Sequence, residues 1–228
     1  MVDFDAMVGL AVLRLRSASD QGNATRMAAY MKTDLPFYGV QKPGRTEILR
    51  EINSEHPIEL RSDYEAAVSA LWHLPHREEK YLALGVARAY PQFISRSAVP
   101  MYRRMIVEGA WWDFVDEIAI HLSGRVLFED RSRMTATIRT WSNHRDLWLR
   151  RSAIIAQIGH KSATDEDLLF SVCLSRADER EFFIRKAIGW ALRDYARTAP
   201  GAVTRFLDTH EGALSPLSVR EGGKHLER

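Results

Sequence analysis

A period of 35 residues is the feature of this chain that most constrains its fold. The interval separates Asp116, Arg151 and Lys186. Four residues upstream, it also separates Trp112, Leu147 and Phe182. A fixed period of this length is typical of helical repeats that stack into a solenoid, because equivalent positions of successive repeats then line one continuous surface. The period therefore predicts that these side chains lie on one face of adjacent, stacked helices.

Helical periodicity dominates the rest of the chain, and the alternation expected of β-strands is nearly absent. Pro36, Gly39, Pro43 and Gly44 predict one irregular segment over Asp34–Arg45. Helices are expected at Phe4–Arg16, Asn23–Met31, Arg45–Asn53, Asp63–Leu74, Glu79–Tyr90, Ser97–Glu108, Trp111–His121, Arg131–Thr140, Arg145–His160, Asp165–Leu174, Glu181–Arg197 and Gly201–Thr209. Short helices with short connectors and this repeat length predict an all-α fold, an α-solenoid of HEAT-like repeats with a concave binding face. We expect one domain over residues 1–228, with a frayed C-terminal tail at 215–228.

Composition places the chain among ordinary soluble proteins. Hydrophobic residues make up 46% and charged residues 27% of its 228 residues, with a net charge of +2. This weakly basic balance is poor evidence for nucleic-acid binding by itself, since basic residues can line one face while acidic residues dilute the total. The single cysteine, Cys173, excludes an internal disulfide. The N-terminal segment lacks the apolar core of a signal peptide, and no run is long enough for a membrane span, so we expect a soluble, cytoplasmic protein with no membrane partner.

The tryptophans and the basic pairs each have two interpretations. A tryptophan in a helical repeat is more often a core residue than a ligand contact, and pairs such as Arg150-Arg151 can be ordinary surface charges. Consecutive helical residues point about 100° apart, so Trp111 and Trp112 cannot easily share one buried stripe. Trp112 is the candidate for exposure, because Asp116 follows one turn later on the same face. An acid, two bases and indole rings on one face suit a cationic ligand held between phosphates, and damaged DNA fits this best.

No motif in the sequence indicates a metal ion or a nucleotide cofactor. His73 and His76 have a spacing that zinc ligands can have, but no third ligand is near them in sequence. Glycine-rich phosphate loops and nucleophile elbows are absent. We therefore expect a function that needs no metal or cofactor.

Four segments together resemble a known family, the alkylpurine DNA glycosylases of HEAT-like repeat architecture, of the AlkD type. They occur in the order and with the separations of that family, and the resemblance extends from about Met27 to Leu214. The segments are Pro36–Arg45, Trp111–Asp116, Asp146–Arg151 and Phe182–Arg193.

The resemblance implies a role for each matching position. The family's catalytic carboxylate corresponds to Asp116, its two DNA-contacting tryptophans to Trp112 and Trp190, and its active-site arginine to Arg151. Tyr30 and Gln41 match an aromatic and an amide near the strand opposite the lesion. Further candidates for DNA contact are Lys42, Arg45, Arg150 and Lys186, with Arg150 alternatively a supporting residue beside Asp113 and Glu117.

The implied reaction agrees with these residue types. Alkylation at N3 or N7 gives a purine positive charge and makes it a good leaving group, and cleavage of its glycosidic bond produces an oxocarbenium-like sugar. A fixed carboxylate such as Asp116 can stabilise that cation and orient water. Indole faces can pack on the deoxyribose, and Arg151 is expected to hold a backbone phosphate. The resemblance implies that the lesion is excised without flipping into a pocket, from duplex DNA bound by a monomer.

Two rival functions remain open from the sequence alone. A HEAT-like scaffold could bind DNA or a protein partner on a concave face without catalysis, and it would not need Asp116. A purely structural solenoid that mediates protein interactions would bury both Trp112 and Trp190.

Overall fold

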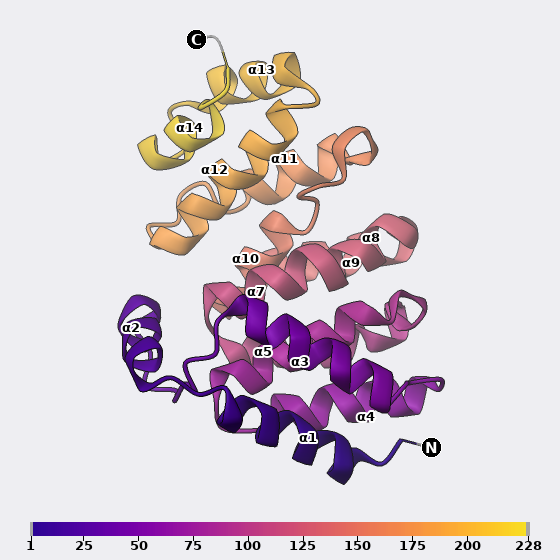
Figure 1. Cartoon of the computed structure of the whole chain (residues 1–228). Helices are drawn as coiled ribbons and strands as arrows, with labels where there is room; N and C mark the ends of the chain where they lie inside the picture. Colours follow the sequence, from indigo (N-terminus) through magenta and orange to yellow (C-terminus); the bar gives the residue numbers. More distant parts are fainter. Residues whose placement is uncertain (1, 227–228) are drawn as a thin grey trace. The chain divides into compact units, whose positions relative to one another are not determined.

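The computed structural model describes residues 2–226 and contains no β-strand among them (Figure 1). The expected all-α fold class is confirmed, because the chain folds into short helices joined by turns. None of the helices in this described part is both long and apolar enough to span a membrane. The chain divides into two compact units, Met1–Ile94 and Ser95–Arg228. The single domain expected from the sequence therefore remains a prediction.

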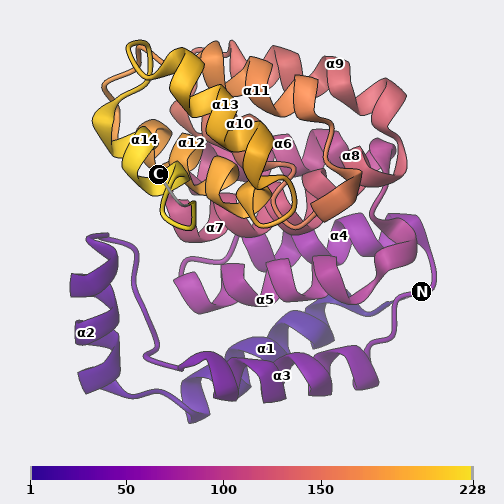
Figure 2. The same cartoon turned by 90° about the horizontal axis from the view of Figure 1, so that it is seen from above.

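The first unit contains five α-helices. They are α1 (Phe4–Ser17), α2 (Gln21–Met31), α3 (Lys42–Glu55), α4 (Arg61–Trp72) and α5 (Arg77–Ala89). Helix α1 packs against α3 and α4, and α4 packs along α5. Core positions such as Met7, Ile52 and Leu71 are fully buried between these helices. Figures 1 and 2 both show α2 standing apart from the other four, joined to α3 by the irregular segment.

The second unit contains the helices that carry the 35-residue register. They are α6 (Val99–Gly109), α7 (Trp112–Ile118), α8 (Gly124–Glu129), α9 (Arg131–Ser142), α10 (Leu147–Ile155), α11 (Glu166–Leu174), α12 (Phe182–Ala196), α13 (Pro200–His210) and α14 (Pro216–Gly222). Helix α10 packs against α7 on one side and α12 on the other. The predicted neighbours in the repeat are thus neighbours in space, and α10 is the central helix.

Three boundaries differ by three residues or more from the sequence-based expectation. Helix α3 begins at Lys42 rather than Arg45, because Pro43 and Gly44 fall in its first turn, where a missing N–H costs nothing. The helix expected to end at His121 instead continues through a π-helical turn, Ala119–Ser123, into α8. The expected helix at 145–160 is shorter, since α10 ends at Ile155.

The expectation of a frayed tail at 215–228 is wrong for residues 215–226, and residues 227–228 lie outside the described part. Ser215 caps α14, with its side chain accepting from the Ser218 backbone N–H, and Pro216 occupies the first turn. The Ser218 hydroxyl is fully buried and donates to the Arg185 carbonyl oxygen at 3.0 Å. Helix α14 therefore packs along α12. Its N-terminal cap and its buried face offset the conformational entropy that the segment loses on becoming ordered.

The π-helical turn brings α8 close to the end of α10. A Cβ atom at Gly124 would lie 2.4 Å from the Ala156 carbonyl oxygen, so only glycine permits this approach. The Nε2–H of His160 donates to the Gly124 carbonyl oxygen at 3.1 Å. Burial lowers the pKa of His160 to about 4, so the ring is neutral at physiological pH and its donated proton is on Nε2.

Candidate functional site

A two-pronged ion pair between Asp116 of α7 and Arg151 of α10 forms the centre of the candidate site. Nε and Nη2 of Arg151 donate to Oδ1 and Oδ2 of Asp116, each at 2.7 Å. The remaining terminal nitrogen, Nη1, donates to the Phe183 carbonyl oxygen at 2.7 Å. Side-chain exposure is only 6% for Arg151 and 14% for Asp116. Three hydrogen bonds therefore fix the arginine, and the carboxylate keeps a narrow exposed edge.

Local sequence explains why the two side chains meet. Asp146 caps α10 by accepting from the backbone N–H groups of Trp148 and Leu149, which sets where the helix begins. Arg151 then lies one turn into α10, as Asp116 does in α7, and the adjacent helices place them side by side. The sequence predicted this neighbourhood, but it predicted a solvent-facing cluster. The structure shows a largely buried pair, because the ion pair removes both polar ends from water.

Two opposing effects act on the pKa of Asp116: its burial and its contact with Arg151. Burial raises the pKa of Asp116 above its usual value, and the nearby Asp113 carboxylate raises it further. The hydrogen bonds and the positive charge of Arg151 oppose that rise. A carboxylate in this position is poorly hydrated, so its interaction with a nearby cation is less screened than it would be in water.

The expected phosphate contact of Arg151 is not what this geometry provides. Its guanidinium group holds the Asp116 carboxylate and a backbone carbonyl, and the side chain is only 6% exposed, so little of it faces solvent. Arg151 is better described as the residue that orients Asp116. A carboxylate accepts about four hydrogen bonds, so two lone pairs of Asp116 remain available when the fork is in place.

An aromatic cluster lies around the ion pair. The ring of Trp111 contacts those of Trp148 and Phe183, with centroids 5.9 and 5.7 Å apart, and Trp148 and Phe183 are 5.0 Å apart. The Arg151 guanidinium lies 5.8 Å from the Phe183 ring centroid. The sequence analysis did not predict this cluster, because it treated the tryptophans only as core residues or ligand contacts. It fixes the backbone carbonyl that Arg151 uses.

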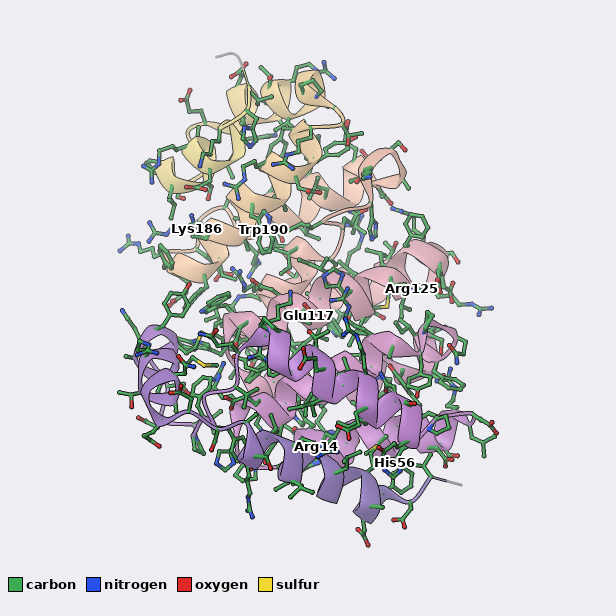
Figure 3. All side chains as sticks on the ribbon, viewed as in Figure 1. Arg14, His56, Glu117, Arg125, Lys186 and Trp190 are labelled. Atoms are coloured by element: carbon green, nitrogen blue, oxygen red, sulfur yellow. The ribbon has the colours of Figure 1, made fainter. Side chains whose placement is uncertain are left out.

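The two predicted DNA-contacting tryptophans are half-buried. Trp112 lies one turn before Asp116 on α7, and Trp190 lies on α12, where Figure 3 shows it one turn beyond Lys186. Trp190 also packs against the core formed by α10, α12 and α13. Trp112 was expected to be exposed and Trp111 buried. The structure differs, because Trp111 and Trp112 are both half-buried. The full burial that a purely structural solenoid requires is not observed either.

Two predicted DNA-binding cations of this unit are engaged in ion pairs. The Arg150 side chain, 13% exposed, pairs with Glu179 at 2.8 Å and donates to the His144 and Arg145 carbonyl oxygens. Lys186 pairs with Glu221 of α14 at 3.3 Å and remains 38% exposed. Arg150 therefore holds the loop before α10 in place, so the alternative of a supporting role fits it better than DNA contact.

The candidate residues of the first unit are mostly at its surface. Tyr30 is 75% exposed, and Gln41 and Lys42 are exposed at the start of α3. Arg45 differs, because its Nη1 donates to the Val40 carbonyl oxygen at 2.7 Å and its guanidinium lies 4.4 Å from the Tyr81 ring centroid. The unit thus offers exposed groups at Tyr30, Gln41 and Lys42, and a stacked cation at Arg45.

A buried glutamate organises the loop that precedes α3. Glu78, fully buried, accepts from the backbone N–H groups of Tyr38, Gly39 and Val40 at 2.8–3.1 Å. Gly39 adopts a φ of +89°, and a Cβ there would lie 2.0 Å from the Asp20 carbonyl oxygen. These contacts and the backbone conformation of Gly39 hold the segment in one loop conformation. No local signal in the sequence points to Glu78.

Comparison with known proteins decides the family. The model of the family described as DNA alkylation repair enzyme matches residues 11–226. This chain belongs to the DNA alkylation repair enzyme family. A solved structure titled "Predicted DNA alkylation repair enzyme from Enterococcus faecalis" is 30% identical, with a TM-score of 0.85 over 92% of this chain and 97% of that one. No curated protein matches significantly. As a family member, the chain has a role in DNA alkylation repair, with DNA as its substrate.

Proposed function

We propose that this DNA alkylation repair family member is a DNA glycosylase. It excises cationic alkylated purines, chiefly 7-alkylguanine and 3-alkyladenine, from duplex DNA by hydrolysing the N-glycosidic bond. The observation that carries the proposal is the fixed, poorly hydrated Asp116 carboxylate, held on both oxygens by Arg151 beside partly accessible indole rings. Family membership supplies the substrate, and this geometry supports the reaction.

Asp116 is assigned the catalytic role because of its charge and its fixed position. Loss of a cationic purine leaves positive charge on the deoxyribose, and a preorganised carboxylate stabilises that charge without reorganising. The two lone pairs left free by Arg151 can face the sugar or an attacking water. Burial strengthens the interaction of the carboxylate with the cationic sugar, but it also raises the pKa of Asp116. Arg151 opposes that rise and so favours the ionised carboxylate.

Trp112 and Trp190 are assigned to the deoxyribose. Each ring is half-buried, so it is held by the protein and remains partly accessible. Such faces can pack on a sugar and attract its developing positive charge through the ring quadrupole. A site of this kind acts on the backbone side of the lesion, so excision would not require the base to enter a pocket. It would require a base that is already a good leaving group.

The decisive experiment measures release of 7-methylguanine from methylated duplex DNA by the native chain and by Asp116→Asn. The substitution keeps shape and removes charge, so we expect excision to fall on the order of 100-fold or more with DNA binding retained. Glu117→Gln is the matched control, because Glu117 is the adjacent half-buried acid of α7 and pairs with His121 at 3.9 Å (Figure 3). Equal excision by the native protein and Asp116→Asn would refute the assignment.

A second measurement separates the glycosylase from the rival scaffold. The native protein should release 7-methylguanine but act poorly on hypoxanthine, because a neutral base needs an acid that the proposed site does not supply. A chain that binds methylated duplex yet releases no cationic base would be a non-catalytic DNA-binding scaffold.

A further inference from the structure

The first unit contains a cavity that the proposed catalytic chemistry does not use. It is open to solvent, has a volume of about 250 Å³ and lies where α2 stands apart from α3 and α5, as Figure 2 shows for these helices. Its lining consists of Arg26, Met27, Tyr30, Met31, Phe37, Arg45 and Tyr81. Three aromatic rings, two methionines and two guanidinium groups therefore meet in one cavity, and none of these lining residues is acidic.

The inner wall of this cavity is rigid. Arg77, 1% exposed, lies behind it, with Nε 3.4 Å from the Tyr81 hydroxyl and its guanidinium 5.7 Å from the Phe37 ring centroid. In front of that wall, the Arg45 guanidinium covers the Tyr81 ring at 4.4 Å and is tied to the Val40 carbonyl oxygen. The cation–π contact between Arg45 and Tyr81 is thus formed before any ligand binds. Tyr30, 75% exposed, stands on the opposite wall on α2.

The chemistry of the lining selects a planar, neutral ring that carries an anionic group. Aromatic and guanidinium planes stack well on nucleobases, and guanidinium groups bind phosphates. A cavity of about 150 Å³ accepts benzene, so 250 Å³ has room for a larger base. A cationic alkylpurine would be repelled by Arg26 and Arg45, so the cavity does not serve as a second lesion site.

We propose that this cavity receives an unpaired, undamaged nucleotide of the bound DNA. The base stacks between Tyr30 and the Arg45–Tyr81 pair, and Arg26 contacts its phosphate. The proposal uses DNA as the family's substrate, but it does not depend on Asp116 or on excision. It gives the protein a preference for duplexes with a nucleotide displaced from the helix.

The test compares two undamaged duplexes, one fully paired and one with a single bulged nucleotide, by fluorescence anisotropy. One stacked base contributes about 5- to 150-fold in affinity, so the native protein should prefer the bulged duplex by about fivefold or more. Tyr30→Ala should abolish that preference. Leu13→Ala, which truncates a 57% exposed side chain of α1 outside the cavity, should keep it. Arg26→Gln should weaken the preference, and Arg50→Gln, at an exposed position of α3, should not.

Photocrosslinking identifies the position of the base. A bulged 5-iododeoxyuridine should crosslink to Tyr30, Phe37 or Tyr81, as mapped by mass spectrometry. Equal affinity for the two duplexes, equal effects of Tyr30→Ala and Leu13→Ala, or crosslinks elsewhere would each overturn the proposal. Because both duplexes are undamaged, loss of bulge preference and loss of 7-methylguanine release by Asp116→Asn are separate outcomes.

Discussion

Removing Arg151 should destabilise the second unit in a manner that depends on pH. In Arg151→Ala, the Asp116 carboxylate stays largely buried but loses both donors and the positive charge that opposes its desolvation. Breaking a buried ion pair by removing one partner costs about 3–5 kcal/mol. We therefore expect the free energy of unfolding to fall by about 3 kcal/mol near neutral pH, with the lost contact to the Phe183 carbonyl oxygen as part of the cost.

The sign of the pH dependence follows from the pKa of Asp116. Without Arg151, burial and Asp113 raise that pKa without opposition, so the folded variant binds a proton more readily than the unfolded chain does. The stability of the variant therefore falls as pH rises from the pKa of Asp116 in the unfolded chain to its higher pKa in the folded chain. Above the folded pKa the stability stays low. The cost of Arg151→Ala should therefore be smaller at about pH 5 than at about pH 7.5.

Urea denaturation followed by tryptophan fluorescence measures this cost. Trp72 is the only one of the six tryptophans outside residues 95–228, so the signal reports chiefly on the unit that contains the pair. Adding Asp116→Asn to Arg151→Ala should recover about 1–2 kcal/mol near neutral pH, because a neutral amide has a smaller desolvation cost than an unpaired charge. A cost that is equal at both pH values, with no recovery in the double variant, would refute the reasoning.

Three further outcomes are expected. Excision should fall as pH is lowered through a folded Asp116 pKa above the usual aspartate range, and Asp113→Asn should move this acid limb to lower pH because it removes a like charge; a pH–rate profile measures both. Lys42→Ala, at an exposed position, should weaken binding to all duplexes and reduce the slope of log affinity against log salt by about 1. Arg150→Ala should leave that slope unchanged, because the Arg150 side chain is only 13% exposed and is paired with Glu179. Glu78→Ala should destabilise the first unit by about 3 kcal/mol, since three backbone donors lose a buried acceptor, and limited proteolysis should then cleave near residues 36–40.

The order and type of the helices could be predicted from the sequence because helical periodicity is a local property. The 35-residue register is also present in the sequence, and it predicts that Asp116 lies beside Arg151 because equivalent positions of stacked repeats are neighbours. The prolines and glycines predict the irregular segment at 34–45, although the sequence did not show that α3 begins at Lys42. Family resemblance then supplied the chemistry that a period alone cannot.

Tertiary structure decided which of these side chains are accessible. Arg150 is engaged by Glu179, 29 residues away, and Lys186 by Glu221 on a helix that the sequence suggested was a frayed tail. Arg151 turned from an expected phosphate ligand into the residue that holds Asp116. Glu78 holds a loop about 40 residues earlier in the chain. Whether a long charged side chain faces solvent or a buried partner depends on which remote residue packs against it, and a local pattern contains no record of that partner.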